Sequence, residues 1–103
     1  MILSTASSPE EGERIARTLI EQRLAACVNI VPKLASVYRW EGRIETASEV
    51  LLLIKTSAVL VDRAETALRS VHSYQIPEFL VFNPESGDAD YIAWLIDSVQ
   101  LPE

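Results

Sequence analysis

Hydrophobic and polar positions along the chain alternate between the period of a helix and the pattern of a strand. The apolar start at 1–6 predicts a first strand, and apolar side chains then recur at helical spacing through 8–24. Ser8 can cap a helix, Pro9 suits the first helical position, and Glu11 completes a capping box. These residues predict a helix that begins at Ser8 and Pro9.

From 26 to 56 the pattern becomes that of strands and predicts one long hairpin. Pro32 predicts a bend or bulge in the first arm, because proline has no N–H for a sheet ladder. Glu41 and Gly42 predict the tight turn, since glycine accepts the positive φ that hairpin turns need. The return arm is 43–56. The hairpin has about thirty residues, so each of its arms is much longer than the mean strand of ~5–6 residues. We therefore expect the arms to reach past their own domain and to pair with another element there.

The remaining third of the chain predicts a helix, a strand and a second helix. Residues 62–72 return to helical spacing, 76–83 form an apolar strand-like run, and 88–99 predict a short terminal helix. Asp88 or Asp90 would cap that last helix.

The predicted order is β-α-β-β-α-β followed by a final helix, in a single domain over 1–103. This is the split-βαβ arrangement of a ferredoxin-like α+β fold, with helices on one face of a four-stranded antiparallel sheet. The run Val50–Ile54 is apolar on both faces, whereas a sheet face open to water should alternate. Because no further element is left to cover the second face, we infer a homo-oligomer. Tyr38 and Trp40, near the hairpin tip, would supply contacts between subunits.

Composition and charge narrow the classes of partner. Nine Lys plus Arg against fifteen Asp plus Glu give a formal net charge of −6, the wrong sign for a surface that binds nucleic acid. We expect no secretory signal, because no basic region precedes the three apolar residues at the start, and no segment has the ~20 apolar residues of a membrane helix. One cysteine allows no intramolecular disulfide, so we expect a cytoplasmic protein.

Five stretches of the sequence resemble one family in the same order: 24–32, 36–45, 49–56, 72–78 and 90–95. Together they are similar to the CutA divalent-cation tolerance family over nearly the whole chain. The resemblance implies a ferredoxin-like subunit in a homotrimer similar to the PII-type signalling trimers. It also implies a link to tolerance of copper and other divalent metals.

His72 is the only histidine, and it matches the family's His-x-Tyr motif. The resemblance makes it the candidate metal ligand, although a histidine at a helix end also interacts with the helix dipole. A copper or zinc site needs three or four ligands, so copies or carboxylates of other subunits would have to complete it. Some family members have a cysteine and a second histidine where this chain has Ser4 and Val71, and a proline where it has Ser73. We therefore expect weak binding of copper or another divalent cation, and no required cofactor.

Several other motif residues are candidates for a cleft between subunits. Cys27 is more simply a small apolar residue of a strand than a ligand. Lys55 and Glu78 are best explained as an ion pair that holds the trimer together. If the motif residues converge, they form a small-molecule site with polar and aromatic lining: Cys27, Tyr38, Trp40, Lys55, Tyr74, Glu78 and Trp94.

No enzyme signature is present in the sequence, which lacks a glycine-rich phosphate loop and a G-x-S-x-G motif. We therefore predict a non-catalytic trimeric protein that binds a divalent metal or a small ligand, with no nucleic acid or membrane partner. One alternative is a PII-like module for a small anionic metabolite, with Lys55 as its charge partner. The other is an enzyme that uses Cys27 and His72 as nucleophile and base, a pair that their spacing does not support.

Overall fold

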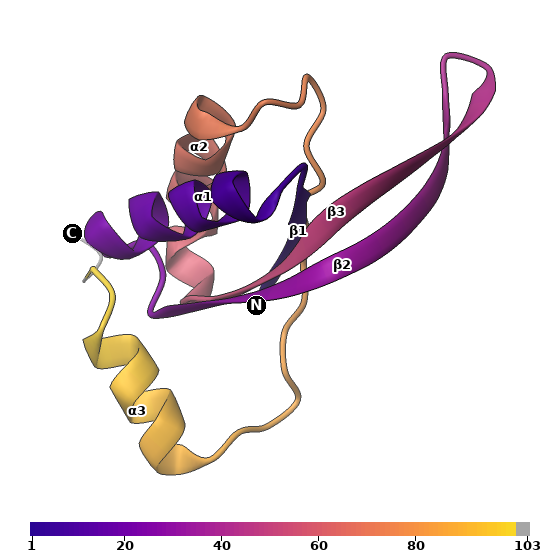
Figure 1. Cartoon of the computed structure of the whole chain (residues 1–103). Coiled ribbons are helices and arrows are strands. Elements are labelled where there is room, and N and C mark those ends of the chain that lie inside the picture. The colour runs from indigo at the N-terminus through magenta and orange to yellow at the C-terminus, as the bar shows by residue number, and fades with distance from the viewer. Residues whose placement is uncertain (101–103) are drawn as a thin grey trace.

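The computed structural model describes residues 1–100, so residues 101–103 of the predicted single domain lie outside the described residues. The four strands of these residues form one antiparallel sheet in the order β2-β3-β1-β4. This is the strand order of a ferredoxin-like fold and confirms the α+β prediction (Figure 1). The elements are β1 (Ile2–Ala6), α1 (Pro9–Glu21), β2 (Cys27–Trp40), β3 (Arg43–Lys55), the 3₁₀ turn η1 (Ala58–Leu60), α2 (Val61–Val71), β4 (Leu80–Val81) and α3 (Ala89–Asp97).

Helix α1 begins where the sequence predicts, but its capping box is only half formed. The Ser8 side chain is the N-cap and accepts the Glu11 N–H over 3.1 Å. The Glu11 carboxylate does not accept the Ser8 N–H, as a complete capping box would require. It accepts instead from the N–H and the hydroxyl of Ser7, at 2.9 and 2.8 Å. Its second oxygen accepts from Ser73, beyond the end of α2, so a long-range contact replaces the local one.

The main core lies between the sheet and the pair α1 and α2, which both cover the same face of the sheet (Figure 1). Gly12 lets α1 approach the sheet closely, because a Cβ at this position would stand 2.8 Å from Val50 Cγ2. Burial of these apolar side chains supplies the main stabilisation of the subunit. The largest of them are Ile2, Ile15, Leu19, Leu52, Ile54, Leu60 and Leu68.

The opposite face of the sheet carries no helix of the described chain, and we call it the open face. Directly paired residues of antiparallel strands share a face, so the pair Leu3 and Leu53 lies there, next to the buried pair Ile2 and Ile54. Apolar side chains thus occur on both faces of β3, as the sequence predicts. The same register places Cys27 on the open face, because Cys27 pairs with Lys55 across β2 and β3.

The long hairpin of β2 and β3 contains the predicted bulge and the predicted turn. Pairing shifts between Val31 and Leu34, and Lys33 inside this irregularity has a φ of 59°. At the tip, Glu41 and Gly42 both have positive φ, 50° and 78°, as a two-residue type I′ turn requires. The hairpin extends beyond the other strands (Figure 1), in a molecule 44 Å long.

The fourth strand is much shorter than the predicted 76–83, because only Leu80–Val81 pairs as a strand with β1. Pro77 has no N–H to donate to a ladder. The Glu78 carbonyl is bound by a side chain instead, accepting from the Ser4 hydroxyl over 2.6 Å. The residues before Leu80 therefore form an anchored loop.

Helix α3 lies apart from α1 and α2 (Figure 1). Asp88, and not Asp90, is its N-cap and accepts the Tyr91 N–H over 3.0 Å. The chain buries Leu95 and Val99 at the end of this helix, but several large apolar side chains of α3 remain exposed. None of the helices within residues 1–100 has the length and apolar character that crossing a membrane requires. The exposed apolar residues of α3 are Tyr91, Ile92, Trp94 and Ile96.

Candidate functional site

A groove of about 720 Å³ is lined by the hairpin and by the 74–78 segment, with Thr5 of β1 and Leu51 of β3 also contributing. We call it the hairpin groove. Its volume falls in the range of small-molecule sites, about 300–1,000 Å³. Its aromatic and acidic lining residues are Tyr38, Trp40, Glu49, Tyr74 and Glu78.

The structure separates the predicted cleft residues into three places. Tyr38, Trp40, Tyr74 and Glu78 all line the hairpin groove of a single chain. Cys27 and Lys55 form a cross-strand pair at the other end of the hairpin. Trp94 lies on α3, where its ring is 5.7 Å from that of Tyr91. Convergence of the three places between subunits stays a prediction.

Glu49 is the groove residue that sequence reasoning missed. It is only 8% exposed, and its carboxylate accepts the Tyr74 hydroxyl over 2.5 Å. The signal in the sequence was its position two residues before Leu51, which puts both side chains on the open face. The sequence does not show that Tyr74 reaches this carboxylate, because the loop after α2 has no periodic pattern.

Negative charge dominates the electrostatics of the groove. Burial, and then repulsion by the charge of Glu49, raise the pKa of the Glu78 carboxyl. Burial also raises the pKa of the Tyr74 hydroxyl, and the hydrogen bond to Glu49 and its charge act in the same direction. No Lys, Arg or His is among the described residues that line the groove. The lining is therefore acidic and aromatic.

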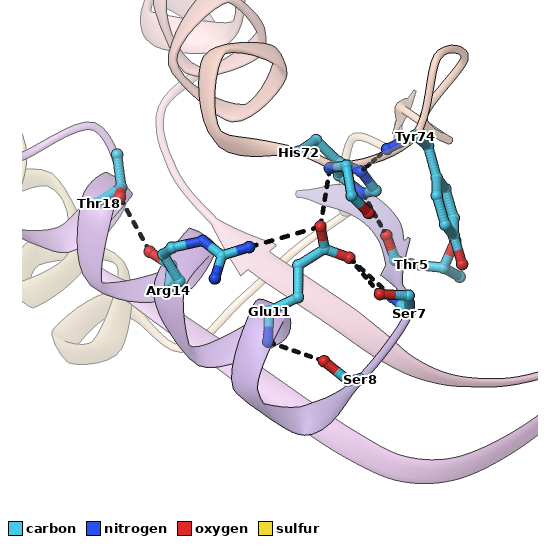
Figure 2. A network of polar contacts seen from close by, with 9 residues as sticks. Thr5, Ser7, Ser8, Glu11, Arg14, Thr18, His72 and Tyr74 are labelled. Atoms are coloured by element: carbon cyan, nitrogen blue, oxygen red, sulfur yellow. Dashed lines mark hydrogen bonds and ion pairs between the residues drawn. The ribbon is translucent and has the colours of Figure 1, made fainter.

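One wall of the hairpin groove is the 73–78 segment, and His72 fixes the start of this wall through both of its ring nitrogens (Figure 2). Nε2 lies 2.7 Å from the Thr5 carbonyl oxygen, and Nδ1 accepts the Tyr74 N–H over 3.1 Å. These partners require a neutral ring with its proton on Nε2. A metal would have to displace one of them, and no three His, Cys, Asp or Glu side chains within residues 1–100 gather around a possible metal position. The metal role of His72 stays a prediction.

The Glu11 carboxylate is a second anchor of the same wall (Figure 2). Beside the two bonds from Ser7, it accepts the Ser73 N–H over 2.7 Å, and the Arg14 guanidinium lies 3.7 Å away. Burial alone would raise the pKa of Glu11, but the hydrogen bonds from Ser73 and Ser7 outweigh it and lower the pKa to about 2. The start of α1 is thereby tied to the end of α2.

Two departures from the family resemblance take part in these anchors. Ser73 supplies the N–H to Glu11, which a proline at this position would lack. Ser4 is fully buried and binds the Glu78 carbonyl, at the other end of the wall. Both serines therefore hold the 73–78 segment in this chain.

Lys55 has a partner outside the groove. Its ammonium donates to the side-chain oxygen of Asn29 on the neighbouring strand. Within residues 1–100 of one chain the ion pairs are Arg14 with Glu11 and Arg17 with Glu13, so Lys55 and Glu78 do not pair there. The predicted Lys55–Glu78 pair between subunits stays a prediction.

The fold and the groove together define a small ferredoxin-like protein with a ligand-sized site on its open face. A family model described as CutA1 divalent ion tolerance protein matches residues 1–98. The chain belongs to this CutA1 family, which confirms the resemblance found in the sequence.

Solved structures of the family share the fold closely. The divalent cation tolerance protein Cut A1 of Thermus thermophilus is 38% identical, with a TM-score of 0.93 and 96% of each chain covered. The PII-like protein CutA of Nostoc sp. PCC 7120 is 34% identical, with a TM-score of 0.89 and coverage of 98% of this chain and 97% of that one. These likenesses support the PII-like architecture expected from the sequence.

Protein CutA of Mus musculus is 42% identical over 91 residues, which are 88% of this chain and 51% of the mouse protein. The chain thus spans about half the length of this relative.

Proposed function

We propose that the protein acts without catalysis, as a self-associating member of the divalent-cation tolerance family that binds a small ligand in the hairpin groove. The observation that carries this proposal is the lining of the groove. Tyr38, Trp40 and Glu78, from two stretches of the family resemblance, line one groove beside the bonded pair Tyr74 and Glu49. Aromatic surface with a few placed polar groups is typical of a small-molecule site.

The arrangement of Cys27 and His72 favours binding over an enzymatic role. Cys27 is paired with Lys55 at the far end of the hairpin, whereas His72 is bonded to Thr5 and Tyr74. A nucleophile and its base must lie within hydrogen-bond reach of each other. No hydrogen bond links these two residues in the described chain.

The open face and the exposed apolar side chains support self-association as a homotrimer. Val31 and Leu80 on the open face are 41% and 50% exposed, and the hairpin and α3 add further apolar surface. Both edge strands of the sheet, β2 and β4, are free for pairing within the described chain. We expect sedimentation equilibrium to give about three times the subunit mass of 11.5 kDa, and a monomer mass would contradict the proposal.

Tryptophan fluorescence tests whether the groove binds a ligand. In a Trp94→Phe variant, Trp40 is the remaining tryptophan and lies in the groove lining. We would titrate this variant with zinc(II), ATP and choline as representatives of a divalent cation, an anionic metabolite and an organic cation. A saturable change that Glu49→Gln weakens supports the proposal. No saturable response to any of the three probes would contradict it.

We also propose a cytoplasmic location, on the sequence grounds given above. One structural neighbour, CutA from Archaeoglobus fulgidus, is described as periplasmic. Fractionation of cells that express the full-length protein distinguishes the two compartments, and recovery outside the cytoplasm would contradict the proposal.

A further inference from the structure

Helix α3 carries more apolar surface than its own chain covers. Of its nine residues only Leu95 is buried, whereas Trp94 is 49% exposed and Tyr91, Ile92 and Ile96 are between 38% and 44% exposed. The helix makes no extended contact with another helix or strand among residues 1–100. A helix this short is marginal in water without packing, and a helix that is apolar on most sides is normally buried. A further partner is therefore needed to cover α3.

The hairpin has an exposed apolar surface on the side away from the groove. Beyond the bulge, Val37 pairs with Thr46 and Arg39 pairs with Ile44, so these four side chains share one side of the hairpin. We call this surface the outer strip. Val37 and Ile44 are 71% and 70% exposed, the highest values among the large apolar side chains of residues 1–100. A partner on the outer strip leaves the groove on the other side open to a ligand.

The two surfaces carry opposite charges. Asp90 and Asp97 lie four residues before and three residues after Trp94, so on α3 they are neighbours of its ring. Arg39 contributes the positive charge of the outer strip. The ion pairs within residues 1–100 join other side chains, so these three charges are not neutralised inside the described part of the chain.

The two surfaces cannot meet within one chain. Helix α3 lies at one end of the molecule and the hairpin tip at the other, in a subunit 44 Å long (Figure 1). In a cyclic homo-oligomer with more than two subunits, each contact between neighbours joins two different surfaces of the same chain. A homotrimer therefore brings a matching pair of surfaces from opposite ends together three times.

We infer that α3 of each subunit packs across the outer strip of the next subunit in the ring. Trp94 lies there against Val37 and Ile44, and burial of these apolar side chains stabilises the contact. The Arg39 guanidinium faces the carboxylates beside Trp94, which fixes the direction in which α3 crosses the hairpin. The inference rests on the proposed self-association and goes beyond it, because it names the two surfaces that meet.

Cross-linking between subunits tests the inference on the full-length protein. Cys27→Ser removes the native cysteine, and Thr46→Cys with Ala93→Cys then puts one thiol on the outer strip and one on α3 beside Trp94. A short bismaleimide linker joins thiols on facing surfaces without the strict geometry of a disulfide. We expect it to shift most chains to covalent dimers and trimers in a denaturing gel. The matched control combines Thr46→Cys with Glu21→Cys on the exposed surface of α1 and should stay at the subunit mass.

Charge reversal tests the electrostatic part of the contact. Arg39→Glu puts like charges opposite each other and should speed the exchange of subunits between labelled and unlabelled oligomers by roughly tenfold. Asp97→Lys in the same chain makes the charges opposite again and should restore part of the wild-type rate. A positive charge in the last turn of α3 also suits the helix dipole. Arg69→Glu makes the same change of charge on the exposed surface of α2 and should leave the rate unchanged.

Sedimentation equilibrium separates a failure of this inference from a failure of the proposed function. A trimer that the linker does not join through Thr46→Cys and Ala93→Cys, or joins equally in the α1 control, would overturn the inference and leave self-association in place. Exchange no faster in Arg39→Glu than in Arg69→Glu would overturn the pairing of charges. A monomer mass for the wild type would overturn both proposals.

Discussion

The backbone N–H of Ser73 donates to the Glu11 carboxylate over 2.7 Å and joins residues that lie 62 positions apart in the sequence. The contact ties the first turn of α1 to the segment that forms one wall of the hairpin groove (Figure 2). Ser4 holds the other end of that segment through the Glu78 carbonyl. The shape of the groove therefore depends on groups that do not line it.

The lowered pKa of Glu11 makes folding stability depend on pH. A carboxyl whose folded pKa lies below its unfolded value stabilises the fold above the unfolded pKa, about 4.3 for glutamate, and loses this contribution as the pH falls. With a folded pKa of about 2, the contribution is about 3 kcal/mol near neutral pH. We expect Glu11→Gln to lower the free energy of unfolding in urea at pH 7.

The difference between Glu11→Gln and the wild type should shrink steadily as the pH is lowered from 5 towards 2. Glu10→Gln is the control, because Glu10 is exposed in the same helical turn and should change stability little. An equal destabilisation at pH 7 and pH 2 would show that the charge of Glu11 is not the cause.

Ser73→Pro tests the anchor from the donor side. His72 already has extended dihedral angles, φ −91° and ψ 138°, which suit a residue before proline. The substitution removes the N–H that Glu11 accepts, and we expect a loss of roughly 1–3 kcal/mol in the free energy of unfolding, offset in part by the stiffer unfolded chain. Ser73→Ala keeps the N–H and should stay close to the wild type. Unchanged stability of the proline variant would contradict the role given to this bond.

Gly12→Ala should destabilise the protein although alanine favours helices. The new Cβ would stand 2.8 Å from Val50 Cγ2, a short side chain fixed in the core. Overpacking of this kind costs about 1–3 kcal/mol, more than the ~1 kcal/mol that alanine gains over glycine in a helix. Thermal unfolding measures the difference.

Gly87→Ala is the matched control for Gly12→Ala. Its Cβ would stand 2.9 Å from Ile92 Cδ1, the end of a flexible and partly exposed side chain that can turn away. We expect little change in its melting temperature. If Gly12→Ala is as stable as Gly87→Ala, α1 has room to move away from the sheet.

His72→Gln distinguishes a positioning role from a metal role. Because both ring nitrogens already bond to Thr5 and Tyr74, we expect the variant to lose about 1–2 kcal/mol of stability. If His72 is also the metal ligand that the family resemblance implies, the affinity of the folded variant for copper(II), measured by calorimetry, should be about tenfold lower than that of the wild type. An affinity equal to that of the wild type would contradict the metal role and leave the positioning role.

Regular elements were predictable from the sequence because their patterns are local. The helix start at Ser8, the bulge at Pro32 and the turn at Glu41 and Gly42 depend on residue types within a few positions of each other. The short fourth strand was not predictable. An apolar run looks the same whether its carbonyls join a ladder or, as at Glu78, accept from a side chain.

The candidate site was predictable only in part, for the same reason. The family motifs contain Tyr38, Trp40, Tyr74 and Glu78, which the structure places in the groove lining. A sequence motif gives no distances between side chains. The motif residues therefore also included Lys55, which lies outside the groove and binds Asn29. The hydrogen bond between Glu49 and Tyr74 requires that Glu49 point to the open face of β3 and also that the loop after α2 bring Tyr74 to it. No local sequence pattern contains both conditions.

The bulge in β2 changes which positions of that strand, odd or even, face the open side of the sheet. Before it, odd positions such as Val31 share the face of Leu51, and after it, even positions such as Leu34 share the face of Glu49. Tyr38 and Trp40 point into the groove because of this change from odd to even. With the pairing of Val31 and Leu34 kept and no second bulge, an insertion or deletion of one residue between Leu34 and Tyr38 would turn both rings to the opposite face. The number of residues between the bulge and the aromatic rings therefore constrains the groove as much as the residue types do.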